Sequence, residues 1–539
     1  MSGSSTDLFR VRVLRDPSEP SAADRLLQTL AHVFRFETIG DELSAAKGTI
    51  ILGTPDALSA SGTVTSFAAP AADEAGGHRC VETEVRFADE DEVAFPFRNR
   101  RVRTPLPQGH PPLAMEPFDK VLATTSSGVL WSVRTTDGVQ HYRSALPLLA
   151  IGEEQALSDA MGGNRFIENL PLMHFLFELS APRWHAPPLR AAFIFDDPNL
   201  HWHTYGYVRY KDVAERAVRE NFHAAFAAIP LDAWFTHQPT ASIFRQNHRS
   251  LSLLIHGNNH GRHELAQAAS ASGTDALLRQ AVQRIEHLES KAGLDVCRVM
   301  VPPHGACSGQ TLAALPGAGF EAACISPGSL QAHSVNAAAN PSLGFFPAEN
   351  VNGCHVMPRS AFHGSAENAM LVAAYLGRPM ILRGHHQDLK GGLDLLDGYA
   401  RFINGLGNVE WLKLSSLARR SYRFSNDAEV CTLEPRSRRV DFALPPTAAH
   451  LRIAAGTDVA ADATYTVCVD GRPVELAAGE RTSLAGTGAP RVVSVTTNHR
   501  KRYGDKEDAS VPRTAASLIA RRLLTESRDR LSSVLGVGA

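Results

Sequence analysis

The stretch FIFDDPNLHW, from Phe193 to Trp202, decides how the rest of the chain is interpreted. It begins as an apolar, aromatic run, which is typical of a buried strand. The run stops at two adjacent carboxylates, Asp196 and Asp197, and the following Pro-Asn predicts a turn. Burying a carboxylate costs several kcal/mol unless the group is paired or bound to a metal. Two acids at a strand end therefore indicate a functional site, with a locally capped turn as the simpler alternative.

Composition excludes several classes of protein. The chain has 539 residues, of which 44% are hydrophobic and 20% charged, and its formal net charge is -2. Such a length predicts about three domains, and the charge gives no sign of a nucleic-acid binder or a polybasic membrane anchor. No apolar run approaches the roughly 18 residues of a membrane span. The N-terminus lacks a signal pattern and the seven cysteines form no CxxC pair, so we expect a reducing, cytoplasmic setting without disulfides or a cysteine zinc site.

The first third of the chain predicts a small α/β domain over residues 1–151, of flavodoxin-like or amidotransferase-like type. Its expected elements are a strand at 8–14, a helix at 21–36 with Ser21 as N-cap, a strand at 48–53, a loop at 54–80, and one or two hairpins within 121–151. The domain contains no nucleophile motif, so we expect a structural role. Residues 152–187 read as a helical connector.

The middle of the chain, 188–426, alternates strand and helix patterns, which favours an α/β barrel, whole or incomplete. Residues 427–500 alternate polar and apolar positions between Asp-Gly and Gly turns, which predicts a small antiparallel β module. Residues 510–536 predict an amphipathic closing helix that packs on its own protein or on a second subunit. A homo-oligomer formed through the terminal domains is therefore one expectation.

A second polar cluster follows a later apolar strand, in Ile-His-Gly-Asn-Asn-His at 255–260. His256 and His260 lie four residues apart, so a helical turn or a folded loop would place both imidazoles on one side. Imidazole is a good ligand for zinc and similar divalent metals. Two histidines and one aspartate make three protein ligands and leave a position for water, as a catalytic site requires.

Taken in order, these motifs resemble the polysaccharide deacetylases, also called the NodB-homology domain or carbohydrate esterase family 4. The resemblance covers roughly 190–425. It implies that Asp196 is the general base and that Asp197, with His256 and His260, holds a divalent metal, with Zn²⁺ expected first. It also implies a deacetylase-type (β/α) barrel and a carbohydrate substrate.

Two further stretches complete the resemblance. VPPHGACS at 301–308 resembles the family's Arg-Pro-Pro-Tyr-Gly turn, whose backbone helps to hold the reaction oxyanion, and this implicates Pro303 and His304. ILRGHHQDL at 381–389 resembles the late strand that ends in the catalytic histidine. His385 fits that position best, and His386 is the alternate.

The turn departs from the family pattern, because Val301 stands where the family has an arginine and His304 where it has a tyrosine. The family's arginine pairs with the catalytic base, and Arg383 or Arg298 could replace it. Trp202 could stack on a sugar ring or belong to the core. His263 shares a helix face with His260 and is a weaker candidate for a spare ligand.

The sequence thus predicts a metal-dependent hydrolase that removes acetyl groups from a carbohydrate. N-acetyl is favoured over O-acetyl only because the family favours it. Two alternatives stay open: hydrolysis of a small amide or imide, and a non-catalytic glycan-binding or scaffold protein. A cytoplasmic setting suggests that the substrate is nucleotide-linked, lipid-linked or an oligosaccharide.

Overall fold

The structure is a computed structural model of the chain, and it divides into two compact units. The first unit comprises Met1–Trp184 and Asn336–Phe345, and the second comprises His185–Val335 and Phe346–Ala539. The structure describes all residues except 1–7, 16–22, 41–45, 54–63, 71–78, 163, 181–183, 262, 268–269, 337, 457–462, 470, 485–490, 499–515 and 536–539. The finer division into five segments stays a prediction.

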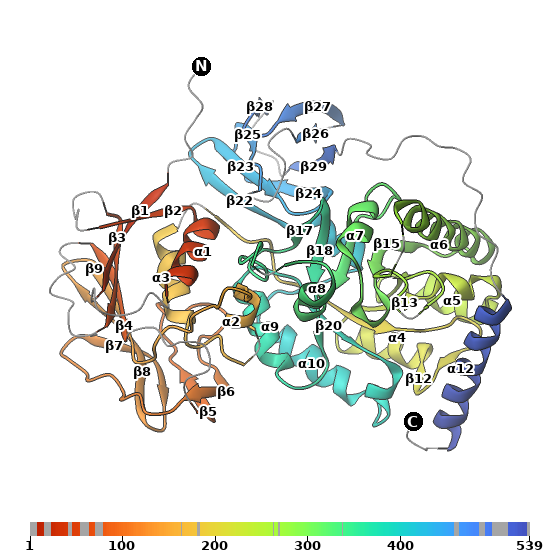
Figure 1. Cartoon of the computed structure of the whole chain (residues 1–539), viewed down its shortest axis with the longest axis horizontal. Helices are drawn as coiled ribbons and strands as arrows, with labels where there is room; N and C mark the ends of the chain where they lie inside the picture. Colours follow the sequence, from red (N-terminus) through yellow and green to blue (C-terminus); the bar gives the residue numbers. More distant parts are fainter. Residues whose placement is uncertain are drawn as a thin grey trace. The chain divides into compact units, whose positions relative to one another are not determined.

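The first unit is built on a nine-stranded sheet in the order β2-β1-β3-β4-β9-β8-β7-β5-β6 (Figure 1). Its strands are β1 (Phe9–Arg15), β2 (Phe36–Ile39), β3 (Gly48–Gly53), β4 (Thr65–Pro70), β5 (Cys80–Phe87), β6 (Arg101–Pro107), β7 (Asp119–Thr125), β8 (Gly128–Thr136) and β9 (Val139–Ser144). Its helices are α1 (Asp24–Phe34), α2 (Leu157–Ala160) and α3 (Leu170–Ser180). Strands β2, β1, β3, β4 and β9 pair in parallel, and β9, β8, β7, β5 and β6 pair antiparallel.

The expected strands near 8–14 and 48–53, the helix between them and the hairpins after residue 121 are present in this unit. The helix ends at Phe34, however, and Phe36–Ile39 form β2, a strand that was not expected. The loop expected at 54–80 is wrong for Thr65–Pro70, which form β4 between β3 and β9. The Ala-, Gly-, Ser- and Pro-rich composition of 54–80 predicts a loop, but the central residues of β4 are buried between its neighbouring strands. Helix α1 begins at Asp24, and Ser21 lies outside the described residues. The flavodoxin-like or amidotransferase-like type remains a prediction.

The second unit contains a ten-stranded mixed sheet with the main order β17-β18-β16-β15-β14-β13-β10-β20-β19, while β21 also pairs with β10. Its strands are β10 (Arg190–Asp196), β13 (Ala224–Ala228), β14 (Leu251–His256), β15 (Val296–Val301), β16 (Ala322–Ile325), β17 (Glu349–Val351), β18 (Cys354–Pro358), β19 (Ser360–Ala361), β20 (Met380–Gly384) and β21 (Glu410–Trp411). Only the β17–β18 pair in this sheet is antiparallel among the described strands.

Helices connect these parallel strands (Figure 1). They are α4 (Tyr210–Arg219), α5 (Gln238–Gln246), α6 (Ala271–Ala292), α7 (Gly309–Ala314), α8 (Pro327–His333), α9 (Ala366–Tyr375), α10 (Asp394–Asn404) and α11 (Leu414–Arg419). Short 3-10 turns η3 (Pro230–Trp234), η4 (Pro303–Gly305) and η5 (His386–Leu389) and the ribbon β11 (Thr204–Tyr205) with β12 (Val208–Arg209) lie between them. This arrangement confirms the mixed α/β class predicted for the region.

The sheet curls on itself, because its two ends belong to one short piece of chain. Strands β17 and β18 form one end of the sheet, where β18 pairs with β16, and β19 forms the other end, where it pairs with β20. A single residue, Arg359, separates Pro358 of β18 from Ser360 of β19. The ends of the curled sheet therefore meet at Arg359. The sequence pattern predicted no strand in this segment. That the curled sheet is a deacetylase-type barrel stays a prediction.

Alternation along β10 decides which side chains face the inside of the curled sheet. Ala192 and Ile194 belong to an apolar cluster with small or branched residues of the neighbouring strands. Phe193 packs on Phe222 and Trp411 outside that cluster. Because side chains alternate along a strand, Asp196 falls on the same side as Ile194. The strand thus carries a carboxylate to the inner end of the sheet, where it is 3% exposed.

The end of the chain forms a β module and a final helix, both in the second unit. The module consists of β22 (Tyr422–Asp427), β23 (Val430–Pro435), β24 (Arg439–Leu444), β25 (His450–Ile453), β26 (Thr464–Val469), β27 (Arg472–Ala477), β28 (Arg481–Ser483) and β29 (Arg491–Asn498). They form two four-stranded sheets over a shared apolar core, antiparallel except for the β23–β25 pair. Helix α12 (Ala516–Leu535) follows. No helix in the described part of the chain has the length and apolar character that crossing a membrane requires.

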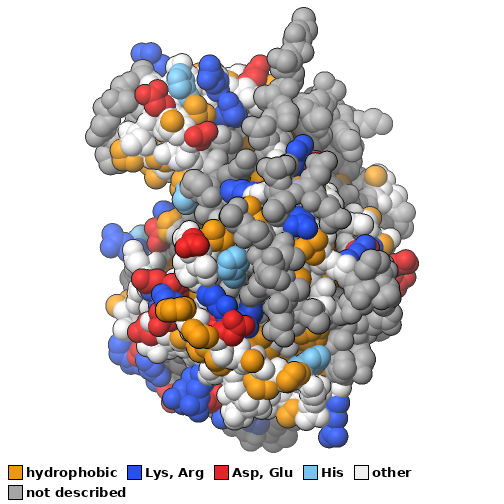
Figure 2. All heavy atoms as spheres, turned by 90° about the vertical axis from the view of Figure 1, so that its left-hand side faces the viewer, with side chains coloured by type: hydrophobic (Ala, Val, Ile, Leu, Met, Phe, Trp, Pro, Cys, Tyr) orange, Lys and Arg blue, Asp and Glu red, His pale blue; other side chains and the backbone are white. Residues whose placement is uncertain are grey.

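Basic and acidic side chains are intermixed on the face shown in Figure 2. This pattern agrees with the formal net charge of -2. The described residues drawn there form no extended field of one sign, and such a field is what steers a protein to a polyanion.

Burial of His223, the residue before β13, predicts a loss of stability in mild acid. Its ring bonds to the Arg249 carbonyl and to the Ser252 hydroxyl, and burial lowers its pKa to about 4. In the unfolded chain this histidine has an ordinary pKa of about 6.5. Between about pH 4 and pH 6.5 the imidazole is therefore protonated in the unfolded chain and neutral in the folded chain. Stability is therefore full above about pH 6.5 and falls by up to roughly 3 kcal/mol as the pH drops towards 4.

Urea unfolding at pH 7 and pH 4.5 checks this expectation. The variant His223→Gln should show a smaller difference between the two pH values than the unchanged chain. The variant His248→Gln, at an exposed histidine, serves as the control and should keep the full difference. Equal pH dependence in all three proteins would contradict the assignment.

Candidate active site

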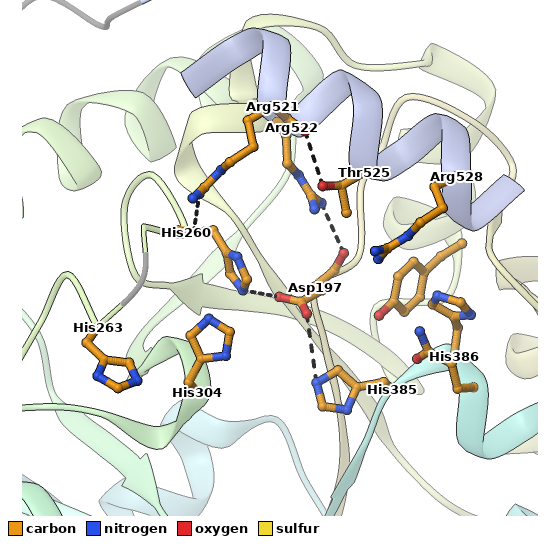
Figure 3. Close-up of a pocket in the computed structure, with 12 residues that line it drawn as sticks. Asp197, His260, His263, His304, His385, His386, Arg521, Arg522, Thr525 and Arg528 are labelled. Atoms are coloured by element: carbon orange, nitrogen blue, oxygen red, sulfur yellow. Dashed lines mark hydrogen bonds and ion pairs between the residues drawn. The ribbon is translucent and has the colours of Figure 1, made fainter. Parts of the chain in front are cut away.

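Three side chains converge at the carboxyl end of the curled sheet: Asp197 directly after β10, His256 at the end of β14, and His260 in the loop that follows β14. The Nε2 atoms of His256 and His260 lie 3.0 and 2.7 Å from Oδ1 of Asp197. The three ligand atoms all lie within 4.8 Å of one another. Asp197 has a φ of 67°, so the chain leaves the extended conformation of β10 at this residue. The carboxylate and two imidazoles therefore face a common point, and Figure 3 shows Asp197 pointing at His260.

The backbone of a neighbouring strand fixes the orientation of His256. This residue ends β14 and is buried, and its Nδ1 donates to the Val301 carbonyl at 2.8 Å. Because a carbonyl only accepts, Nδ1 carries the hydrogen and Nε2 is directed at Asp197. Burial opposes the charged form of His256, but the hydrogen bond to Asp197 and the negative charges of Asp197 and Asp196 together outweigh burial and raise the pKa of the imidazole. An outer hydrogen bond of this kind is what orients a metal-bound histidine.

The loop between the two histidines is shaped by Gly257 and held by Glu264. Gly257 has a φ of 61°, and a Cβ there would lie 2.4 Å from Glu264 Oε1 and 2.6 Å from Pro303 Cγ. Glu264 accepts hydrogen bonds from the backbone N–H groups of Asn258, Asn259 and His260 at 2.8 to 3.1 Å. One carboxylate thus fixes the turn that presents His260, which itself has a φ of 54°.

Removing Glu264 should weaken metal binding without removing a ligand. In Glu264→Ala three backbone N–H groups lose their acceptor, so the loop no longer holds His260 in place. Loss of such an outer partner typically costs about 10- to 100-fold in metal affinity. Calorimetric titration with Zn²⁺ measures this change. Glu286→Ala, at an exposed position of α6, is the matched control, and equal affinities in the two variants would show that Glu264 does not position His260.

Asp196 is paired with Arg359, at the point where the ends of the sheet meet. Nη1 of Arg359 lies 2.9 Å from both carboxylate oxygens, and both side chains are buried. Burial raises the pKa of Asp196, but the charge of Arg359, helped by His256 and His385, outweighs it and leaves the pKa below its ordinary value. Asp196 is therefore ionised at neutral pH although it is surrounded by protein.

Neither arginine suggested by the sequence as the partner of Asp196 forms this ion pair. Arg298 pairs with Glu289 of α6 instead. Arg383 is half-buried and lines the same cavity as Asp196. The ion pair of Asp196 is nevertheless with Arg359, so neither candidate replaces the arginine of the turn.

The two adjacent histidines after β20 lie in different surroundings. His385 Nε2 is 3.8 Å from Asp197 Oδ2. The ring of His386 is buried between Tyr205 and Tyr207, with ring centroids 4.9 and 5.6 Å away. Of the pair, His385 thus faces the aspartate and His386 packs against aromatic side chains.

Of the other residues predicted to contact the substrate, some line the cavities around Asp197 and others do not. His304 lines the cavity and has a φ of 56°, whereas Pro303 is buried against Gly257. Trp202 is 45% exposed and stacks on His237, and it is not among the residues that line the cavities around Asp197. His263 lines the outer cavity, outside the group of three converging ligand atoms.

Two adjoining cavities surround the cluster. The inner one, of about 280 Å³, reaches Asp196, Arg359 and Arg383. The outer one, of about 490 Å³, extends to helix α12. Both are lined by Asp197 and His260, so they meet at the three converging ligands.

The donor set of Asp197, His256 and His260 fits a divalent metal. One carboxylate oxygen and two imidazole nitrogens are ligands that zinc accepts readily. The outer hydrogen bond of His256 and the loop held by Glu264 supply the supporting contacts that such a site needs. Three ligands beside open cavities leave room for a reacting group.

Comparisons with known proteins give distant similarities only. No protein-family model matches the sequence, and no curated protein is significantly similar to it. A solved structure assigned as a polysaccharide deacetylase from Mycobacterium smegmatis is 15% identical, with a TM-score of 0.33, over 44% of this chain and 91% of that one.

Two carbohydrate esterases of family 4 give similar values. The enzyme from Streptomyces lividans, solved with acetate, is 14% identical with a TM-score of 0.27, over 43% of this chain and 95% of that one. The esterase from Streptococcus mutans is 14% identical with a TM-score of 0.27, over 42% and 87%. These values do not establish membership of the family.

Proposed function

We propose that this chain is a metal-dependent hydrolase that removes an acetyl group from a carbohydrate, with N-acetyl favoured over O-acetyl and Zn²⁺ as the metal. The observation that carries the proposal is one constellation. A group of three metal ligands lies beside an ionised, buried carboxylate and a third histidine, all at one end of the curled sheet. The preference for an N-acetyl group rests on the family resemblance of the motifs.

Each side chain has a distinct part in this proposal. When bound by Asp197, His256 and His260, a divalent cation supplies Lewis-acid polarisation of the acyl carbonyl and makes an attacking water more acidic. Asp196, kept ionised by Arg359, accepts the proton of that water.

The remaining roles concern the oxyanion and the leaving group. The backbone N–H of His304, which follows Pro303 in the turn, donates to the oxyanion and stabilises it. His385, with Nε2 3.8 Å from Asp197, protonates the leaving nitrogen or oxygen. His386, whose ring lies between Tyr205 and Tyr207 at the edge of the outer cavity, is the alternate.

The presence of all five side chains, Asp196, Asp197, His256, His260 and His385, favours a catalytic protein over one that only binds a glycan. A protein that only holds a glycan gains nothing from a buried ion pair that keeps one carboxylate charged beside three metal ligands. Such a pair costs desolvation free energy and contributes little net stability.

Acetate release from a panel of N- and O-acetylated sugars tests the proposal. The full chain is assayed as purified, after chelation and after reloading with zinc. Release that stops on chelation and returns with zinc supports the metal-dependent deacetylase. No release from any acetylated sugar, with zinc still bound, would overturn it and move the assignment to hydrolysis of a small amide or to binding alone.

A further inference from the structure

We propose that helix α12 forms one wall of this active site and that its arginines bind an anionic group of the substrate, a phosphate or a carboxylate carried next to the acetylated sugar. The inference rests on the proposed function and names its substrate class. The residues of α12 that carry this inference lie more than 250 positions after the proposed metal ligands in the sequence.

Arg522 anchors the helix over the site. Its Nε donates to both carboxylate oxygens of Asp232 at 2.8 and 3.2 Å, and its Nη2 donates to the Asp197 carbonyl at 3.1 Å. The side chains of Arg522 and Asp232 are 12% and 6% exposed, so water screens this ion pair little.

Apolar contacts support the same position. Ile519 and Leu523 of α12 line a small cavity together with Leu231 and Trp234 of η3. The helix is thus fixed to the catalytic unit both by a buried charge and by apolar side chains.

The helix directs further polar groups into the outer cavity. Arg521, Thr525 and Arg528 line it opposite His260, His385 and His386. In Figure 3, Arg521 and Arg522 extend from α12 towards His260 and Asp197, and Arg528 extends towards His386. Arg521 donates to the His260 carbonyl, a neutral acceptor that leaves the charge of the guanidinium in place.

The charge of this cavity favours an anion. Three arginines line it, of which Arg522 is already paired with Asp232, and among its described lining residues Asp197 is the single carboxylate. That carboxylate is already engaged by His256 and His260. A bound divalent cation would make the region more positive still. Arginine binds phosphate and carboxylate with paired, charge-assisted hydrogen bonds, so the chemistry of the wall matches these groups.

Position and size define what the ligand must look like. The cavity of about 490 Å³ lies within the roughly 300–1,000 Å³ of small-molecule sites. It includes Asp197, so one ligand can place its acetyl group at the metal ligands and its anion at α12. A sugar phosphate, a nucleotide-linked sugar or an acetylated uronic acid meets this requirement, and a neutral oligosaccharide does not.

Kinetics on matched substrates test the anion subsite. The panel contains N-acetylglucosamine, its 1-phosphate, its uridine diphosphate conjugate and an N-acetylated uronic acid. We expect kcat/KM to be higher for one of the anionic sugars than for the neutral one, chiefly through KM. In Arg528→Gln the ratio of anionic to neutral kcat/KM should fall at least tenfold, and Arg521→Gln should act in the same direction. Arg472→Gln, at an exposed position of β27, is the control.

The three anionic sugars of the panel distinguish which kind of anionic group the subsite binds. A preference for the 1-phosphate indicates a phosphate monoester, a preference for the conjugate indicates a nucleotide-linked sugar, and a preference for the uronic acid indicates a carboxylate. Equal kcat/KM for neutral and anionic sugars, unchanged in Arg528→Gln, would overturn the subsite and leave the deacetylase proposal standing.

A binding measurement keeps the inference testable if no sugar is deacetylated. Calorimetric titration with glucosamine 1-phosphate reports the anion subsite without turnover, and zinc content is measured in every variant. Binding that weakens at least tenfold in Arg528→Gln, with zinc retained, supports the subsite. Binding of equal strength in the variant would place the phosphate on the metal and overturn the part assigned to α12.

Discussion

Asp197→Ala should abolish tight metal binding and, with it, all acetate release. The variant removes one of three ligands and leaves the rings of His256 and His260 facing each other, with centroids 5.2 Å apart. Two imidazoles alone hold a divalent metal far less tightly than three ligands do. The loss should exceed the roughly 10- to 100-fold that removal of an outer partner costs. Metal content by mass spectrometry and zinc affinity by calorimetry measure it.

His256→Ala should show the same loss, because it removes a ligand on the other side of the cluster. Asp295→Ala, at a carboxylate that is 78% exposed and bonded to Lys413, is the matched control and should keep both metal and activity. Full metal in both ligand variants would mean that the three side chains are not the ligands. The proposed function would then lose its main support.

Replacing Arg359 by Met should cost both turnover and stability. Asp196 then stays buried without its partner, and removing one member of a buried ion pair typically costs about 3–5 kcal/mol. The pKa of Asp196 should rise, since the charge of Arg359 is the main influence that lowers it against burial. A protonated Asp196 accepts no proton, so acetate release should fall although the metal ligands are intact. Urea unfolding, metal content and turnover are measured on the same preparation.

A double variant separates the two effects. In Arg359→Met with Asp196→Leu the buried carboxylate is gone, and an apolar pair of similar volume is often neutral or stabilising. We therefore expect stability to return while turnover stays absent. Arg298→Met is the control, because Arg298 is half-buried and pairs with Glu289 near the surface. Its pair should be worth only about 0–1 kcal/mol. An Arg359→Met variant as stable and active as the control would contradict a role for Arg359.

The sequence determined the features that are local or periodic. The apolar run before Asp196, the spacing of His256 and His260, and the alternation of strand and helix all act within a few residues. Such patterns fix a strand end, a turn and the side of a strand on which a residue lies. They were therefore enough to select the three side chains that converge in the structure.

Only the tertiary structure decided which distant residues complete the site. Arg359 pairs with Asp196 across 163 positions, because the curled sheet brings its two ends together. Its one sequence signal was an arginine directly after the apolar run Val356-Met-Pro358. Glu264 holds a turn whose shape depends on positive φ values that local patterns did not reveal. The arginines of α12 looked like one face of an amphipathic helix until packing placed them over Asp197. Sheet register and the need to pair buried charges decide which distant segments come into contact. Neither can be predicted from the residue spacing within a single segment.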